Sequence, residues 1–277
     1  MIREYERKIF QKYFLERDSL IAEIVIIGDE VLLGIVREEN ASYIIEELTK
    51  RGFIVRRVVI IGDNLDEIGA VIKDAFKRGA QLVITTGGLG PTEDDLTLDA
   101  VSKAFNIPLE VDQKCVERIK SFYGENVPKS AFQMARRLKG AKIYPSPLGL
   151  APAQLIIMDK EKFLLILPGP PREVRTLLPR ILDEIAKIIG RKVKCSIRFY
   201  VNAREAEITD ILAEVIKKFG VYAKALVSLC QGGKLPIELV CFGENMEKCE
   251  EKLSIVKKYF CEKVRKIFNR KCLDEEF

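Results

Sequence analysis

One segment, TTGGLGPTEDDLT over residues 85–97, constrains this chain more than any other part of it. A short apolar run over residues 81–84 precedes it and predicts a buried parallel strand, and the pattern over residues 98–105 predicts a helix. A glycine-rich turn between a strand and a helix N-terminus lets backbone N–H groups approach an anion closely. The sequence therefore predicts a ligand-binding loop in an α/β fold.

Two adjacent acids in this loop, Asp94 and Asp95, narrow the choice of ligand. Carboxylates would repel a bare phosphate group. They suit a divalent metal ion between the loop and a phosphate, or a ligand that also offers hydrogen-bond donors, as a pterin ring does. The structural alternative is a tight turn in which an aspartate caps the helix. Three glycines and two aspartates exceed what a cap requires, which favours a ligand site.

Strands and helices alternate on both sides of the loop, which predicts βαβ units and a mostly parallel sheet covered by helices on both faces, a three-layer αβα architecture. The segment over residues 142–152 is rich in Pro and Gly and predicts a loop. Strands are expected at residues 23–27, 53–61, 154–158 and 163–167, and helices from residue 40, from residue 65, over 111–137 and over 171–189.

The pattern changes near residue 190, where a strand–helix–strand–strand–helix order begins that predicts a small α+β domain of split βαβ type. We therefore expect three parts: an N-terminal helical extension over residues 1–20, a main domain over 21–190 and a small domain over 191–277. The charged and aromatic segment over residues 1–18 is unlike a secretory signal and is expected to be an exposed amphipathic helix or arm.

Composition excludes several classes of function. The 277 residues include no histidine, which rules out Ser-His-Asp and Cys-His catalysis and leaves Asp, Glu, Lys, Tyr or a metal-bound water for proton transfer. No apolar run reaches the roughly 20 residues of a membrane span, so a cytoplasmic protein without a membrane partner is expected. The 46 basic and 41 acidic residues are finely mixed, which is weak evidence for nucleic acid binding.

The seven cysteines contain no CxxC pair, so a zinc site is not expected. Reduced, buried thiols are the expected state. An intracellular disulfide, as some hyperthermophiles use, is the alternative.

Three candidate loops follow predicted strands, and ligands of open α/β sheets bind at the carboxyl ends of the strands. They are residues 28–30 with Asn40, residues 87–95, and residues 168–173. Each also has a structural interpretation: a solvated turn at Asp29 and Glu30, a plain N-cap at Asn40, and ordinary helix-start charge at Glu173. The stiff loop over residues 146–152 is a candidate pocket wall.

These motifs resemble the CinA proteins in order and spacing. The resemblance lies in GDE at 28–30 with Leu33, Gly34 and Asn40, in residues 85–97, and in PGPP at 168–171 with Glu173. It implies the molybdopterin-binding fold that CinA shares with MogA, MoaB and the gephyrin E domain, over roughly residues 20–190. It also implies a KH-type small domain, while no room is expected for the family's C-terminal nicotinamide mononucleotide deamidase domain.

The resemblance implies a metal-dependent pyrophosphatase that acts on a nucleotide diphosphate such as ADP-ribose or FAD. Asp29, Asp94 and Asp95 would be catalytic, and the same acids with Glu30 would hold Mg²⁺, Mn²⁺ or Co²⁺, the glycine N–H groups binding the pyrophosphate. The expected substrate-binding residues are Thr86, Gly87, Gly88, Gly90, Thr92, Asn40, Ser146, Gly149 and Glu173.

Two alternatives stay open, namely a molybdopterin-binding or adenylyl-transfer protein of molybdenum cofactor assembly, and a nucleic-acid or protein interaction module. The module is less expected because the segment QGGK at residues 231–234 is not the Gly-x-x-Gly loop of a KH clamp. The family pattern implies a homo-oligomer, a dimer or a trimer. The chain departs from that pattern at Ser146, where an Asn is usual, and at Ala153, where a Gly is usual.

Overall fold

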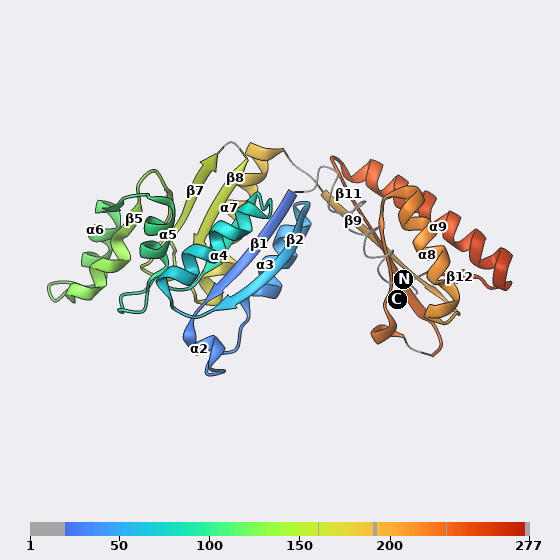
Figure 1. The fold of residues 1–277 in the computed structure, drawn as a ribbon, viewed down its shortest axis with the longest axis horizontal. Helices are drawn as coiled ribbons and strands as arrows, with labels where there is room; N and C mark the ends of the chain where they lie inside the picture. Colours follow the sequence, from blue (N-terminus) through green and yellow to red (C-terminus); the bar gives the residue numbers. More distant parts are fainter. Residues whose placement is uncertain (1–19, 160, 191–192, 231, 275–277) are drawn as a thin grey trace. The chain divides into compact units, whose positions relative to one another are not determined.

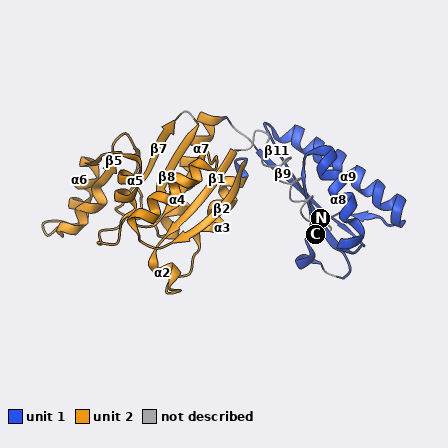
Figure 2. Ribbon diagram, in the orientation of Figure 1, with its two compact units in different colours: residues 1–19, 50–52, 190–277 blue, residues 20–49, 53–189 orange. Residues whose placement is uncertain are grey.

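The computed structural model describes residues 20–159, 161–190, 193–230 and 232–274. The predicted N-terminal arm over residues 1–18 lies outside these ranges. Contacts divide the described chain into two compact units, shown in Figure 2: a larger unit over residues 20–49 and 53–189, and a smaller unit that holds residues 50–52 and those from 190 onward.

The larger unit is built on a six-stranded sheet in the order β2-β1-β3-β8-β7-β6 (Figure 1). The first four strands in this order run parallel, whereas β7 and β6 are antiparallel to their neighbours. The predicted α/β class with a mostly parallel sheet is therefore confirmed. The strands are β1 (Leu20–Ile27), β2 (Phe53–Ile61), β3 (Leu82–Thr86), β6 (Lys142–Tyr144), β7 (Ala153–Asp159) and β8 (Lys162–Leu167).

Helices cover both faces of this sheet. α3 (Asn40–Lys50) and α7 (Pro171–Ile189) pack on the face formed by alternate residues of β1 (Leu20, Ala22, Ile24 and Ile26). α4 (Leu65–Lys77) packs against α5 (Thr97–Phe105) and contacts β1 and β3, which buries the opposite face. The short α2 (Asp29–Leu32) follows β1 directly.

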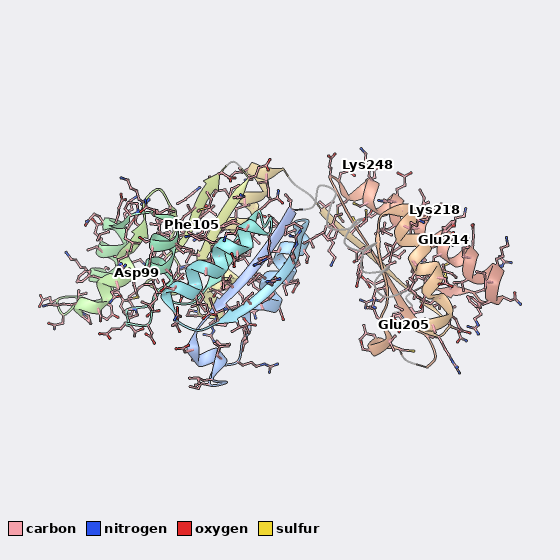
Figure 3. The ribbon with its side chains drawn as sticks, in the orientation of Figure 1. Asp99, Phe105, Glu205, Glu214, Lys218 and Lys248 are labelled. Atoms are coloured by element: carbon pink, nitrogen blue, oxygen red, sulfur yellow. A yellow bond between two sulfur atoms is a disulfide. The ribbon has the colours of Figure 1, made fainter. Side chains whose placement is uncertain are left out.

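Residues 109–138 differ from the helical structure predicted over residues 111–137. They form β4 (Leu109–Val111), α6 (Gln113–Tyr123), the 3₁₀ helix η2 (Lys129–Ala135) and β5 (Arg136–Leu138), and β4 pairs with β5. The side chain of Asp112 starts α6 by accepting the N–H of Cys115, and Gly124 ends it with φ 69°. Asp99 of α5, labelled in Figure 3, forms an ion pair with Arg136 and ties β5 to the larger unit.

The predicted loop from residue 142 also begins with a short strand, β6. The smaller unit has an antiparallel sheet in the order β10-β11-β9-β12, with α8 and α9 packed on one face. The second of the three strands predicted for this domain ends at Ala225, and a 3₁₀ turn follows it. The elements are β9 (Val193–Val201), α8 (Glu205–Phe219), β10 (Tyr222–Ala225), η3 (Val227–Leu229), β11 (Leu235–Gly243), α9 (Met246–Phe268) and β12 (Cys272–Leu273).

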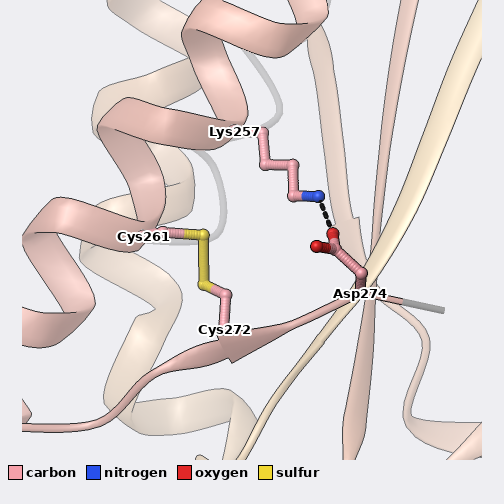
Figure 4. The surroundings of a disulfide bond; sticks show 4 residues. All are labelled: Lys257, Cys261, Cys272 and Asp274. Atoms are coloured by element: carbon pink, nitrogen blue, oxygen red, sulfur yellow. Dashed lines mark hydrogen bonds and ion pairs between the residues drawn. A yellow bond between two sulfur atoms is a disulfide. The ribbon is translucent and has the colours of Figure 1, made fainter. Parts of the chain in front are cut away.

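A disulfide between Cys261 of α9 and Cys272 of β12 corrects the expectation of reduced thiols (Figure 4). It arises because Asn269 ends α9 in a left-handed conformation, φ 54°, and the chain returns beside the helix as β12. The other cysteines are free thiols. Within the described ranges, none of the helices combines the length and hydropathy that crossing a membrane would require.

Candidate functional site

The carboxyl ends of β1 and β3 and the turn after β8 enclose a cavity of about 280 Å³ in the larger unit. Residues of the first and third predicted loops line this cavity, whereas the glycine loop over residues 87–95 does not. The cavity lining includes Glu30, Asn40, Thr86 and residues 169–171. Arg37 and Glu38, two charged residues that the sequence did not indicate as candidates, also line the cavity.

The side chain of Asn40 joins the loops around the cavity. Its Nδ2 donates to Thr86 Oγ1 at 3.2 Å and to the carbonyl of Gly169 at 2.8 Å. Thr86 Oγ1 in turn donates to the carbonyl of Pro168 at 2.8 Å. Asn40 and Thr86 are both buried. These bonds cross-link the start of α3, the end of β3 and the turn after β8, so they set the shape of the cavity.

The N-cap interpretation of Asn40 is wrong, because Glu38 performs that role. Glu38 Oε1 accepts the N–H of Asn40 at 2.6 Å and that of Ala41 at 2.8 Å. The N-terminus of a helix attracts anions through its free N–H groups and its dipole. Since a carboxylate of the chain already occupies this position, these two N–H groups are not open to a phosphate.

The glycine loop packs tightly on its neighbours. Gly87 has φ 106°, and a Cβ there would lie 2.0 Å from the carbonyl oxygen of Ile27. A Cβ on Gly88, with φ 65°, would lie 2.3 Å from Thr97 Oγ1, which itself donates to the carbonyl of Gly87 at 2.8 Å. Both glycines are therefore required for the loop to close on β1 and α5. The N–H of Gly87 donates to the carbonyl of Leu167 at 3.2 Å, so this donor is used within the protein.

Asp95 organises the same loop. Its Oδ1 accepts the N–H of Gly90 at 2.6 Å, and its Oδ2 accepts the N–H of Thr92 at 2.9 Å and also the Thr92 hydroxyl. A carboxylate with three internal donors has little capacity left for a ligand. Of the three glycine N–H groups expected to bind a pyrophosphate, those of Gly87 and Gly90 thus donate inside the protein.

A fifth acid, Asp63, lies beside Asp29 at the end of β2. The N–H of Asp29 donates to Asp63 Oδ2 at 2.9 Å, and the N–H of Asp63 donates to Asp29 Oδ1 at 3.3 Å. Burial raises the pKa of Asp63, and the negative charges of Asp29, Glu30 and Asp94 raise it further. The hydrogen bond from the Asp29 N–H lowers the pKa and only partly offsets these effects. Like Asp29, Asp63 follows a strand of the parallel sheet, and this position in the sequence could have identified it as a residue of the site.

The acids do not assemble into a metal site. Asp94 is exposed. Within the ranges that the structure describes, no group of three His, Cys, Asp or Glu side chains is placed to hold a metal ion. Asp95 is engaged in its loop and Asp29 contacts Asp63, so the acids expected to hold a divalent cation do not form one cluster among the described residues.

The loop over residues 146–152, the candidate pocket wall, lies against the first turn of α7. Ser146 Oγ accepts the N–H groups of Leu148 at 3.3 Å and Gly149 at 3.1 Å, which fixes the turn. The buried carboxylate of Glu173 rests against Gly149, where a Cβ would lie 2.2 Å from Glu173 Oε2. Ala153, which replaces the usual Gly, is buried in β7 without a positive φ, so this departure fits the backbone.

Comparison with known proteins finds relatives that match most of this chain. A protein of Pyrococcus abyssi is 35% identical over 241 residues, which cover 83% of this chain and 93% of that protein. A CinA-like protein of Thermotoga maritima is 34% identical over 199 residues, 70% of this chain and 48% of that protein, so this chain spans about half of that relative. The crystal structure of CinA from Thermoplasma acidophilum, a protein described as having unknown function, matches with a TM-score of 0.56 and 33% identity over 60% of this chain and 98% of that one.

The model of one protein family, described as a probable molybdopterin binding domain, matches residues 23–187. This range contains the six-stranded sheet except for the first residues of β1, together with the cavity, the glycine loop and Glu173. The chain therefore belongs to the family of probable molybdopterin binding domains.

Proposed function

We propose that this chain binds a pterin phosphate of the molybdopterin type at the carboxyl edge of the larger unit's sheet. The cavity held in shape by Asn40 is the observation that carries the proposal. Apolar side chains such as Ile26, Val36 and Pro170 contribute to its lining, and flat heterocycles bind between walls of this kind with a few polar groups for orientation. The family match supports the choice of a pterin.

Arg37 supplies the charge that a phosphate needs. It lines the cavity and is exposed, and its guanidinium is positioned in a loop that otherwise presents acids. Arginine forms paired, charge-assisted hydrogen bonds with phosphate oxygens. Since Glu38 blocks the start of α3 and the N–H groups of Gly87 and Gly90 are used internally, Arg37 is the group to which we assign the phosphate.

Metal-dependent hydrolysis of ADP-ribose or FAD, the function implied by the resemblance to CinA, is less well supported. It requires several carboxylates around one cation, and the acids expected for this are divided between the Asp29–Asp63 contact and the internal bonds of Asp95. Pterin binding requires no such cluster. We therefore place binding before hydrolysis and assign no adenylyl-transfer step.

The test compares a phosphorylated pterin with its unphosphorylated parent, 6-hydroxymethylpterin, by fluorescence titration. The unaltered protein should prefer the phosphorylated form, and Arg37→Ala should lose that preference while still binding the parent. Loss of one charge-assisted contact corresponds to a roughly 10-fold or greater weakening. Arg265→Ala, which removes an exposed arginine of α9 in the smaller unit, is the matched control. Equal binding of both pterins by the unaltered protein would refute the role of Arg37, and binding of neither would refute the function.

A further inference from the structure

Glu173 carries a carboxylate oxygen that nothing in the described chain explains. The residue is 8% exposed, and its Oε2 has no hydrogen-bond partner within the described residues. Buried polar atoms are nearly always paired, and an unpaired charged oxygen is costly. The partner of this oxygen is therefore sought outside the chain.

The position of Glu173 at a helix start does not account for it. A Glu in the first turn often accepts the N–H of the residue that precedes the helix. Here that residue is Pro170, and proline has no N–H. The N–H of Glu173 itself donates to the carbonyl of Pro170 at 3.0 Å. Favourable interaction with the helix dipole needs no burial, so it leaves the buried oxygen unexplained.

Gly149 packs directly against this carboxylate. A Cβ on Gly149 would lie 2.2 Å from Oε2 and 2.4 Å from Oε1 of Glu173, so any other residue would displace the carboxylate. Gly149 is only half-buried, and Ser146 Oγ holds its N–H at 3.1 Å. Pro171, two residues before Glu173, lines the cavity. Glu173 and Gly149 do not themselves line the cavity; Glu173 lies in the same first turn of α7 as Pro171, and Gly149, a residue without a side chain, covers its carboxylate.

A carboxylate can only accept hydrogen bonds, and its two oxygens match two parallel N–H donors. A 2-aminopyrimidin-4-one edge presents such a pair, a ring N–H beside an exocyclic amino group. Pterins and guanine both carry this edge. Adenine places an unprotonated ring nitrogen beside its amino group, and that lone pair would oppose a carboxylate.

We infer that the ligand extends from the cavity past Pro171 to Gly149, and that the Glu173 carboxylate beneath Gly149 recognises the 2-aminopyrimidin-4-one edge of the ligand. The inference rests on the proposed function and deepens it, because it names the part of the ring that the protein reads. It also gives a reason for a buried acid in a protein that binds an anionic ligand: the acid faces the donor edge of the ring and not the phosphate.

The test uses pterin and lumazine, in which a carbonyl replaces the 2-amino group. The unaltered protein should bind pterin roughly 10- to 100-fold more tightly than lumazine, the range for hydrogen bonds to a charged group. In Glu173→Gln the amide donor suits the lumazine carbonyl, so pterin should bind less tightly and the preference should shrink or reverse. GMP and AMP form two further arms. GMP binding more tightly than pterin would assign the site to guanine nucleotides.

Two variants control this experiment. Gly149→Ala should fold, because the atoms that its Cβ meets are the free end of a flexible side chain, and it should lose the pterin preference without a change of charge. Glu247→Gln changes an exposed Glu in the first turn of α9 and should bind as the unaltered protein does. Retention of the pterin preference in Glu173→Gln overturns the inference but leaves a pterin site. Failure of the unaltered protein to bind any of the four ligands overturns the proposed function as well.

Discussion

Replacing Asn40 by Ala should loosen the whole carboxyl edge of the larger unit. The change removes both hydrogen bonds made by Nδ2, to the Gly169 carbonyl and to Thr86 Oγ1. Thr86 Oγ1 keeps its own bond to Pro168, so the main loss falls on the Gly169 carbonyl. A lost bond that leaves a buried group unsatisfied costs about 1–3 kcal/mol. The expected loss of unfolding free energy is therefore about 2–3 kcal/mol.

Hydrogen exchange followed by mass spectrometry measures this loss separately in each unit. Peptides from β3 and β8 report on the larger unit, and peptides from β9 and β11 in the smaller unit serve as an internal control. Asn40→Asp sharpens the test, because it keeps the shape but sets a carboxylate without donors against the Gly169 carbonyl. It should cost at least as much as Asn40→Ala. A loss below about 0.5 kcal/mol in both variants would refute the role of Asn40 as the link between the loops.

Three further results are expected. Burial and neighbouring charges raise the pKa of Asp63, so the folded protein loses stability as the pH rises through that pKa. Asp63→Asn should therefore raise the melting temperature at neutral pH. A gain in melting temperature that persists unchanged in acid would contradict this. Reduction of the Cys261–Cys272 disulfide should lower the unfolding free energy of the smaller unit by roughly 2–3 kcal/mol and spare the larger one, as exchange with and without reductant would reveal. Gly87→Ala should unfold the larger unit, because the added Cβ meets a backbone oxygen. Gly79→Ala is the control: Gly79 has φ 89° and open space around it, so thermal denaturation should show a loss of only about 1 kcal/mol in unfolding free energy.

Much of the fold could be predicted because its signals are local. Gly79 ends α4, and Pro171 begins α7. The alternation of apolar strands with amphipathic helices was enough to indicate a parallel sheet, and therefore the edge at which a ligand site belongs. The misassigned region over residues 109–138 lacks such signals. Its two strands have three residues each, and a 3₁₀ helix shows no clear period of 3.6.

The interactions that define the site are not local, and so the sequence could not reveal them. Asn40 acts on Gly169, 129 residues away, and nothing near Asn40 distinguishes that role from a helix cap. The cap itself is Glu38, a residue type that is less usual in that role. Asp95 was recognised as part of the loop, but the internal donors that occupy it became visible only in three dimensions. The disulfide of Cys261 needed β12, a strand of two residues.

The proposed pterin site is tested most directly by measuring pterin binding and nucleotide hydrolysis on one preparation of the protein. Fluorescence titration with a phosphorylated pterin, with and without EDTA, would be paired with product analysis after incubation with ADP-ribose, FAD and NAD⁺ in Mg²⁺, Mn²⁺ or Co²⁺. We predict saturable pterin binding that EDTA does not abolish, and no metal-dependent release of AMP. Release of AMP that requires the metal, together with no pterin binding, would contradict this prediction.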